Sequence, residues 1–417
     1  QERSLLFLKR KSRTKMKDKL LLLYKLLFIL LCCSIPYFKI ASAVPNIFLI
    51  GLMALFPFVV KKEDFRKFRE MPFYIFGGLV VFLIVNMLFF QEVKLELKII
   101  QKIASVVALI VFSIPLNNLT WLKKGIVGSV GLCVFISLIK IGIYIIETNS
   151  FEFAEGSIIR DLLLVDRLYF GFFCIISILS SLSLFQEKII KKKWLLINIT
   201  INVLFVLLIS SRIAVFLLII LAITSSFYTK QKLKMLFTLF GLAIALIAAF
   251  SINKNLGERF FYTQSEDSNK SYIELAKTWE PRFVIWSCAM DIGKNETNLW
   301  LGNGFYKTKD KLVNCYERTI LKEDKRTYFI AQRFNPHSQF IDFTLSYGFI
   351  GGSFFMVLFI VLFLKYYKNF ITMGYVISLA SFCLIECIFH RQMGAYYFGI
   401  VFILLVFNSY HSKNSSY

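Results

Sequence analysis

Three residues far apart in the sequence carry side chains suited to chemistry on a phosphorylated substrate: Arg212, Arg282 and His337. Arg212 and His337 lie beside long apolar runs, where charged and titratable residues are rare in this chain, and Arg282 lies in the long connection that separates these runs. A guanidinium keeps its charge and binds phosphate oxygens through two parallel hydrogen bonds. A neutral imidazole can accept a proton from a hydroxyl group. Arg212 is therefore suited to an anionic lipid headgroup such as a pyrophosphate, and His337 is suited to accept a proton from a sugar hydroxyl.

The local sequence around each residue supports a position at the membrane boundary. Arg212 follows Ser211 in a short hairpin between two apolar runs. Arg282 begins the stretch 282–290, which we expect to form an amphipathic interfacial helix. His337 follows Pro336 at the first turn of another apolar run. A structural role is the alternative for a histidine in such a place.

Further charged residues at the ends of apolar runs are candidates for supporting roles. Arg167 opens one run, and Glu386 and Arg391 flank the end of another. A charged side chain at a helix centre costs roughly 2.5 to 3.5 kcal/mol in a membrane, so each such residue needs a reason. The alternative is that these side chains are anchors in the lipid headgroup layer, and for Arg167 and Arg391 both interpretations stay open.

The elements that must position these residues are membrane helices. Of 417 residues, 57% are apolar and 18% are charged, and the mean hydropathy is +0.65. Runs of about 18 to 25 nearly uncharged residues recur, each long enough to cross a bilayer, and a spanning backbone of this kind must be helical. The sequence predicts an all-α polytopic protein with about twelve spans, at residues 20–38, 40–60, 71–90, 98–116, 122–146, 163–185, 194–210, 213–229, 235–252, 338–364, 371–389 and 394–409.

Basic residues predict the orientation of these spans. The formal net charge is +23, and lysines and arginines gather in alternate short connections, as the positive-inside rule requires. The charge therefore does not indicate nucleic-acid binding, and no nucleic-acid motif is present. With the basic N-terminal segment inside, one long connection at 253–336 faces outward, between a bundle at 1–252 and spans at 337–417. The run at 20–38 is expected to be retained as a span and not cleaved as a signal, despite Ala41-Ser42-Ala43.

The eight cysteines do not indicate a metal centre. Six of them lie in apolar runs, where they are expected to be small buried hydrophobic residues. Cys288 and Cys315 both fall in the outer connection, where an oxidising compartment permits a disulfide between them. The sequence has no D-x-D motif, phosphate-binding glycine loop or H-E-x-x-H helix, and the expected first outer connection around Lys39 has no carboxylate. We therefore expect metal-independent chemistry with no cofactor.

Three separate patches resemble the O-antigen ligase and O-antigen polymerase superfamily. Ser211-Arg212-Ile213-Ala214 resembles the family's SR-G-A hairpin. Arg282 to Trp286, followed by Gly302-Asn303-Gly304, resembles its R-xxx-W and G-x-G segment. His337-Ser338-Gln339-Phe340, followed by Tyr347 to Gly351, resembles its H-N-xx-L and G-xx-G helix. Each patch alone is a weak signal, but their shared order covers about residues 160 to 390.

The resemblance implies a GT-C-like, inverting glycosyltransferase in the bacterial inner membrane, with its active site on the periplasmic side. Arg212 and Arg282 would bind the diphosphate of an undecaprenyl-diphosphate-linked glycan donor, and His337 would orient or deprotonate the acceptor. The sequence departs from the family pattern at Ser338, often asparagine, and at Ile213, often glycine. These departures affect the expected acceptor contacts more than the expected reaction class.

Two enzymes of this kind fit the sequence equally in donor and residues. A ligase would transfer the glycan to lipid A-core, and a polymerase would transfer it to another lipid-linked repeat. We favour the ligase because of the single basic outer connection and the H-S-x-F helix. A transporter for the lipid-linked sugar is the alternative from another class. It predicts two similar halves and charges at the bilayer midplane, whereas in this sequence the polar residues gather toward one face and the halves do not resemble each other.

Overall fold

The structure is a computed structural model, and it describes residues 2–149, 156–229, 241, 280–295 and 298–414. In these ranges the regular elements are α-helices and short 3-10 helices, and no strand is present. The structure thus has the predicted all-α class. The predicted span at 235–252 lies outside the described residues, apart from residue 241, and so does the predicted boundary at 252.

Helices occur at each of the other eleven predicted spans. Pro45 and Pro72 lie in the first turns of α2 and α3, where proline costs no hydrogen bond, and Asn369 caps the backbone amides that begin α17. The helices of this body are α1 (Glu2–Ser34), α2 (Val44–Val59), α3 (Met71–Phe90), α4 (Val93–Phe112), α5 (Thr120–Thr148), α6 (Gly156–Leu162), α7 (Arg167–Gln186), α8 (Lys192–Leu208), α9 (Arg212–Tyr228), α16 (Gln339–Tyr366), α17 (Phe370–Ile385) and α18 (Gln392–Asn414).

Not all of these helices have the length and composition of a full membrane span. Among the described residues, five qualify by length and hydropathy: Met16–Tyr37, α3, α5, α7 and α16. A sixth is reached if α2 and the 3-10 helix η2 (Lys62–Arg69), bent by 114°, count as one span. The apolar helices α9, α17 and Gln392–Phe407 are shorter. The chain is a helical multi-pass membrane protein, and the count of about twelve stays a prediction.

The burial pattern separates central from peripheral helices. Nearly every side chain of α7 is buried, because this helix packs against α5, α8 and α17. Peripheral helices instead turn large apolar side chains outward, as Phe89, Ile146 and Leu204 do. Extensive apolar surface of this kind marks contact with lipid.

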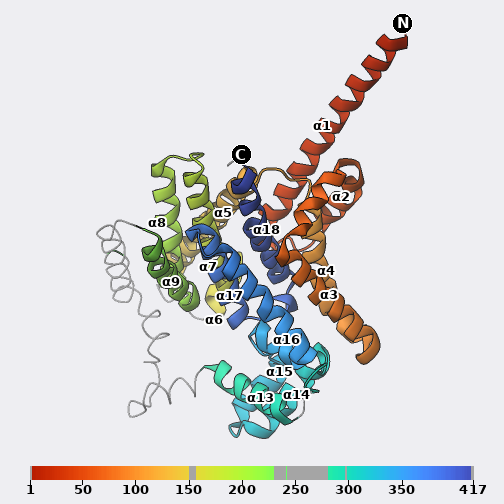
Figure 1. Ribbon diagram of the computed structural model, residues 1–417. Coiled ribbons are helices and arrows are strands. Elements are labelled where there is room, and N and C mark those ends of the chain that lie inside the picture. Colours follow the sequence, from red (N-terminus) through yellow and green to blue (C-terminus); the bar gives the residue numbers. More distant parts are fainter. Residues whose placement is uncertain (1, 150–155, 230–240, 242–279, 296–297, 415–417) are drawn as a thin grey trace.

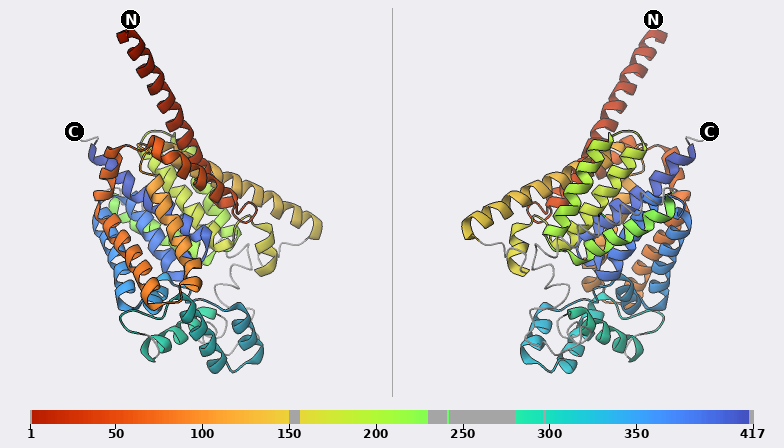
Figure 2. Two further views of the ribbon diagram at one scale, coloured as in Figure 1. Left: turned by 90° about the vertical axis from the view of Figure 1, so that its right-hand side faces the viewer. Right: turned by 90° about the vertical axis from the view of Figure 1, so that its left-hand side faces the viewer.

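A small helical cap covers one end of the bundle. It consists of α13 (Pro281–Asn295), α14 (Phe305–Thr319) and α15 (Glu323–Gln332), and it lies opposite the end that carries both chain termini (Figures 1 and 2). Its small apolar core includes Ile292, Leu312 and Phe329. A disulfide joins Cys288 of α13 to Cys315 of α14, with a Cα–Cα distance of 5.8 Å.

The cap is docked on the bundle by an exchange of backbone hydrogen bonds at a kink in α16. In a regular helix the Phe349 amide would donate to the Leu345 carbonyl. Here Phe349 N donates to Leu299 O at 2.8 Å, and Leu345 O accepts from Asn303 N at 3.1 Å. Gly304 N also donates to Ser346 O at 2.7 Å. The turn at 298–304 therefore satisfies the groups that the kink releases.

Glycine is required on both sides of this contact. Gly348 has φ 63° and ψ −167°, and a Cβ there would lie 2.3 Å from the backbone of Trp300. Gly302 has φ 73°, and its Cβ would lie 2.3 Å from the backbone of Ser346. Such backbone angles cost other residues about 1 to 3 kcal/mol even without a clash. This contact explains why the G-x-G and Y-G patches occur together in the sequence.

We expect Gly348→Ala to destabilise the protein by at least about 1 to 3 kcal/mol, because the new methyl group adds a backbone clash to an unfavourable φ. Gly128→Ala is the matched control, since Gly128 lies inside α5 with open space around it. Alanine there should be neutral or stabilising by about 0.5 to 1 kcal/mol. Thermal unfolding in detergent measures both variants. Equal melting temperatures would contradict the docking role of the kink.

Candidate functional site

The hairpin before α9 presents Arg212 at the cap end of the bundle. Ser210 adopts φ 53°, and Ser211 N donates to Val206 O at 3.3 Å, so the chain reverses within three residues. The hairpin packs closely on α7 at Gly171, where a Cβ would lie 2.8 Å from the Ser211 hydroxyl. Arg212 is the first residue of the next helix, so its position follows directly from this turn.

The first turns of α13 place Arg282 and Trp286 four residues apart, on one face of the helix. The Trp286 indole donates from Nε1 to the carbonyl of Pro336 at 3.0 Å. Arg282 donates from Nη2 to the carbonyl of Ile385 at 3.4 Å. The R-xxx-W pattern therefore connects α13 both to the segment that precedes α16 and to the end of α17.

A single carboxylate joins the two arginines. Glu280 Oε2 accepts from Arg212 Nη2 at 2.9 Å, and Glu280 Oε1 accepts from Arg282 Nη1 at 2.7 Å. The Glu280 side chain is only 14% exposed, so solvent screens these ion pairs less than it would on an open surface. The Nε of Arg282 is buried and has no hydrogen-bond partner. This donor is unsatisfied, which is costly unless a ligand supplies an acceptor.

These residues line a cavity of about 530 Å³. Its charged lining residues in the described part of the chain are Arg167, Arg212, Glu280 and Arg282, and its other walls are mainly apolar. Three arginines against one carboxylate make the cavity positive, which suits a phosphorylated ligand. The cavity is lined by Arg167, Leu168, Ser210, Ser211, Arg212, Ile213, Phe216, Leu217, Glu280, Arg282, Ser381, Leu384 and Ile385.

His337 is held just before α16 in a restricted backbone conformation. Its φ is 47°, and its backbone amide donates to Asn335 Oδ1 at 3.0 Å. The imidazole Nδ1 lies 3.5 Å from Glu386 Oε2, and this nitrogen is buried without a hydrogen bond. A protonated ring would form an ion pair with the carboxylate at this distance. The Glu386 carboxylate is therefore placed to stabilise the protonated form of His337.

Glu386 is a buried carboxylate at the end of α17, only 5% exposed. Burial alone would raise its pKa, but the adjacent His337, together with the charges of Arg391 and Arg282, outweighs burial and lowers the pKa. Glu386 is therefore ionised near neutral pH. Glu386 itself does not line the cavity, but it follows the lining residue Ile385, and the charge of Arg282 acts on its carboxylate.

Arg391 lies outside the cavity and is paired within the protein. Its guanidinium forms an ion pair with Asp166 and lies over the ring of Tyr169, 5.8 Å from the centroid. Asp166 immediately precedes α7, so this pair joins the 386–391 segment to that helix. A role in positioning fits Arg391 better than contact with a ligand.

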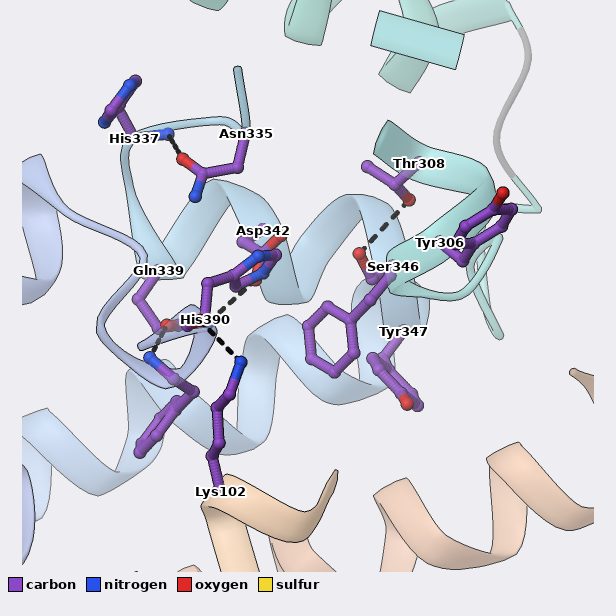
Figure 3. A network of polar contacts seen from close by, with 12 residues as sticks. Lys102, Tyr306, Thr308, Asn335, His337, Gln339, Asp342, Ser346, Tyr347 and His390 are labelled. Carbon is purple, nitrogen blue, oxygen red and sulfur yellow. Dashed lines mark hydrogen bonds and ion pairs between the residues drawn. The ribbon is translucent and has the colours of Figure 1, made fainter. Parts of the chain in front are cut away.

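A second pair of histidine and carboxylate lies beside the first. His390 Nε2 is 2.9 Å from Asp342 Oδ2, and Gln339 Nε2 donates to the same oxygen at 2.9 Å. Gln339 Oε1 accepts from the backbone amide of Phe389 at 3.0 Å. In Figure 3 these side chains lie between α16 and η3 (Ile388–His390), while His337 points away from them.

The two pairs are reciprocal. The segment 337–342 supplies one histidine and one carboxylate, and the segment 386–390 supplies the partners Glu386 and His390. Lys102 of α4 adds a hydrogen bond to the His390 carbonyl at 2.7 Å. These contacts fix the two segments against each other, so the position of Glu386 relative to His337 depends on them.

One group of potential metal ligands occurs among the described residues. One ligand atom each of Asp342, Cys387 and His390 lies within 4.8 Å of the others. In this structure Asp342 and His390 bond directly to each other, and Lys102 places a cation beside them. The observed geometry is that of a hydrogen-bonded pair.

The structure thus brings most of the candidate residues to one end of the bundle, but not all into one cavity. The cavity is lined by Arg167, Ser211, Arg212 and Arg282. His337 instead faces Glu386, which follows the lining residue Ile385, and Arg391 forms an ion pair with Asp166. Sequence reasoning missed three polar residues: Glu280, Gln339 and Asp342. A signal existed for Asp342, since it is a carboxylate inside a predicted span.

We expect His390→Ala and Asp342→Ala to destabilise the protein together by less than the sum of their separate effects. His390→Ala leaves the buried Asp342 with only its bond from Gln339, and Asp342→Ala removes the carboxylate partner of His390, whereas the double variant removes the pair; the coupling energy should therefore be about 0.5 to 3 kcal/mol. Denaturation in detergent measures it. Ser346 lies in the same helix as Asp342, and its hydroxyl donates a 3.2 Å hydrogen bond to Thr308 of α14. Ser346→Ala removes this bond and should show no such coupling with Asp342→Ala. Additive effects for His390 and Asp342 would contradict the paired role.

Comparison with known families covers part of this site, while Arg167, Glu386 and Arg391 lie outside the matched range. A family model described as O-Antigen ligase matches residues 195–356. This range contains the Ser211-Arg212 hairpin, the R-xxx-W helix, the G-x-G turn and His337 with the kinked part of α16. No curated protein matches the chain. Over residues 195–356 the chain is therefore similar to the O-antigen ligase family, which supports the resemblance that the three sequence patches indicated.

Proposed function

We propose that the protein is a metal-independent, inverting glycosyltransferase of the O-antigen ligase type. It transfers a polysaccharide from undecaprenyl diphosphate to a sugar hydroxyl of lipid A-core during lipopolysaccharide biosynthesis. The observation that carries the proposal is the pair Arg212 and Arg282 on one cavity, with His337 and Glu386 beside it. The family match supports ligase or polymerase activity in general.

The cavity supports the binding of a lipid-linked diphosphate. Two guanidiniums lie close enough to contact one carboxylate, so they can also contact one diphosphate. The unsatisfied Nε of Arg282 offers a further donor. Apolar walls such as Phe216, Leu217 and Leu384 suit the first part of a prenyl chain. Phosphate recognition by arginine is bidentate, which orients the donor as well as binding it.

The transfer step follows from these groups. The acceptor oxygen attacks the anomeric carbon while the bond from that carbon to the diphosphate oxygen breaks. The electron pair of the broken bond goes to the diphosphate, where the two arginines stabilise the growing negative charge. The proton of the acceptor hydroxyl goes to His337, and Glu386 stabilises the resulting imidazolium. The arginines thus supply the charge stabilisation that a metal ion supplies in other transferases.

The acceptor is what distinguishes a ligase from a polymerase. A polymerase of the same superfamily would use the same donor and the same residues, with a second lipid-linked repeat as the acceptor. We favour lipid A-core because of the single basic outer segment and the Ser338-Gln339-Phe340 pattern after His337. Supplying each acceptor separately to the purified protein distinguishes the two enzymes.

The location of the site is also part of the proposal. We place the protein in the bacterial inner membrane with the cap and the site on the periplasmic side. The clustering of lysines in 188–193, at the other end of the bundle from the cap, supports this orientation. A periplasmic cap also agrees with the disulfide between Cys288 and Cys315.

We expect purified protein to release undecaprenyl diphosphate from a lipid-linked glycan only when lipid A-core is present. Arg212→Ala and Arg282→Ala should weaken donor binding and lower turnover, and Arg212→Lys should rescue little because an ammonium cannot bind bidentately. His337→Ala should mainly lower turnover, by about 10² to 10⁴-fold, as lost proton transfer does. Mass spectrometry of the released lipid measures the rates.

The assay has one control variant, and three outcomes would contradict parts of the proposal. Glu317→Gln changes an exposed residue of the cap and should leave the rates unchanged. Release driven only by a second lipid-linked repeat would identify a polymerase. An intact glycosidic bond under every condition, with the lipid-linked sugar moved across vesicles, would identify a transporter. A fully active His337→Ala protein would remove the assigned role of the imidazole.

Orientation can be tested with cysteine labelling in intact cells. Lys192 lies at the end of the bundle away from the cap, and Lys322 lies in the cap; both side chains are exposed. Lys322→Cys should react with a membrane-impermeant thiol reagent, and Lys192→Cys should react only after the membrane is opened. The unsubstituted protein, whose described free cysteines are mostly buried, is the control. The reverse pattern would place the proposed site in the cytoplasm.

A further inference from the structure

Glu280 stands out because it is the one acidic residue among the described residues that line the positive cavity. Its two carboxylate oxygens bind different arginines, Arg212 and Arg282, at 2.9 and 2.7 Å. Each arginine has further N–H groups, and the Nε of Arg282 has no partner. The carboxylate therefore occupies the space between the guanidiniums without using all of their donors.

An anion in this position must affect a diphosphate bound by the same arginines. The ligand either displaces Glu280 or binds beside it, and in both cases the carboxylate opposes the negative charge of the ligand. The effect is strong here, because the side chains concerned are largely buried and screening by salt is weak. Glu280 therefore lowers the affinity of the cavity for every phosphorylated ligand.

The penalty is not equal for donor and product. In the proposed reaction the donor is a diphosphate diester, which is bonded to both the prenyl chain and the glycan. The lipid product has lost the glycan and is a diphosphate monoester. The bond between the anomeric carbon and oxygen breaks with its electron pair on that oxygen, so the product gains one negative charge. A fixed carboxylate repels the more highly charged product more than the donor. The same arginines without Glu280 would bind the product most tightly.

We propose that Glu280 is a specificity-determining residue that makes the cavity discriminate between the diphosphate diester donor and the diphosphate monoester product. It competes with the ligand for Arg212 and Arg282 and so promotes release of the spent lipid. The inference rests on the proposed function, since it assumes that the diphosphate binds at these arginines. It adds a role for an acidic residue in a site otherwise defined by its cations.

The test compares Glu280→Gln with the wild type in detergent. Glutamine keeps the size and one acceptor oxygen but removes the charge, so the arginines stay close to their positions. Inorganic pyrophosphate, measured by calorimetry, should bind the variant about ten times more tightly. In the transfer assay undecaprenyl diphosphate should inhibit the variant about ten times more strongly, while the KM for the donor falls by a smaller factor.

The possible outcomes separate this inference from the proposed function. Pyrophosphate that binds Glu280→Gln more weakly than the wild type, or equally well, would overturn the inference, because Glu280 would then only support the arginines. Equal tightening of donor and product would also overturn the discriminating role. Wild-type protein and Arg212→Ala that bind pyrophosphate alike would instead remove the donor site itself. Glu317→Gln removes one negative charge elsewhere in the cap and should leave pyrophosphate affinity unchanged.

Discussion

The kink at Gly348 is the contact on which the arrangement of the site depends. There α16 gives up one of its own backbone hydrogen bonds, and the turn at 298–304 supplies the replacements. An unsatisfied backbone group at this buried position would be costly, so cap and bundle are stable in this register only together. The kink also lies within three turns of His337, and the docked turn leads directly into α14. One irregular peptide thus joins the helix that His337 precedes to the cap that covers it.

Charge pairing across the boundary between cap and bundle completes the site. Arg282 and Glu280 come from the start of α13, whereas Arg212 comes from a hairpin of the bundle. His337 precedes α16, and its carboxylate partner Glu386 follows α17. The pairs Arg212–Glu280 and His337–Glu386 join segments far apart in the sequence, and most of their groups are largely buried. Removing one partner would leave an uncompensated charge, so each pair holds the geometry of the others.

In the proposed mechanism, a site built on cations would limit its own turnover by holding its product. Arginines that stabilise a departing diphosphate also bind the product, and the product is more highly charged than the donor. A carboxylate between the guanidiniums reduces this problem without changing their positions. Glu280 and Glu386 therefore act in opposite directions in the proposed mechanism: one opposes the anion in the cavity, and the other stabilises the cation that forms on His337.

The sequence by itself determined the helical class and the positions of most helices, and it singled out Arg212, Arg282 and His337 as candidates, because apolar runs of membrane length and isolated charges are local signals. It also indicated the turn at Gly302, since glycine in such a pattern permits a positive φ. It did not predict that Glu280 bridges two arginines, that Asp342 pairs with His390, or that Arg391 turns to Asp166. Apart from Glu280 and Arg282, which are two residues apart, those partners lie from 48 to 225 residues apart in the sequence, and only the packing of helices against one another brings their side chains within hydrogen-bond distance.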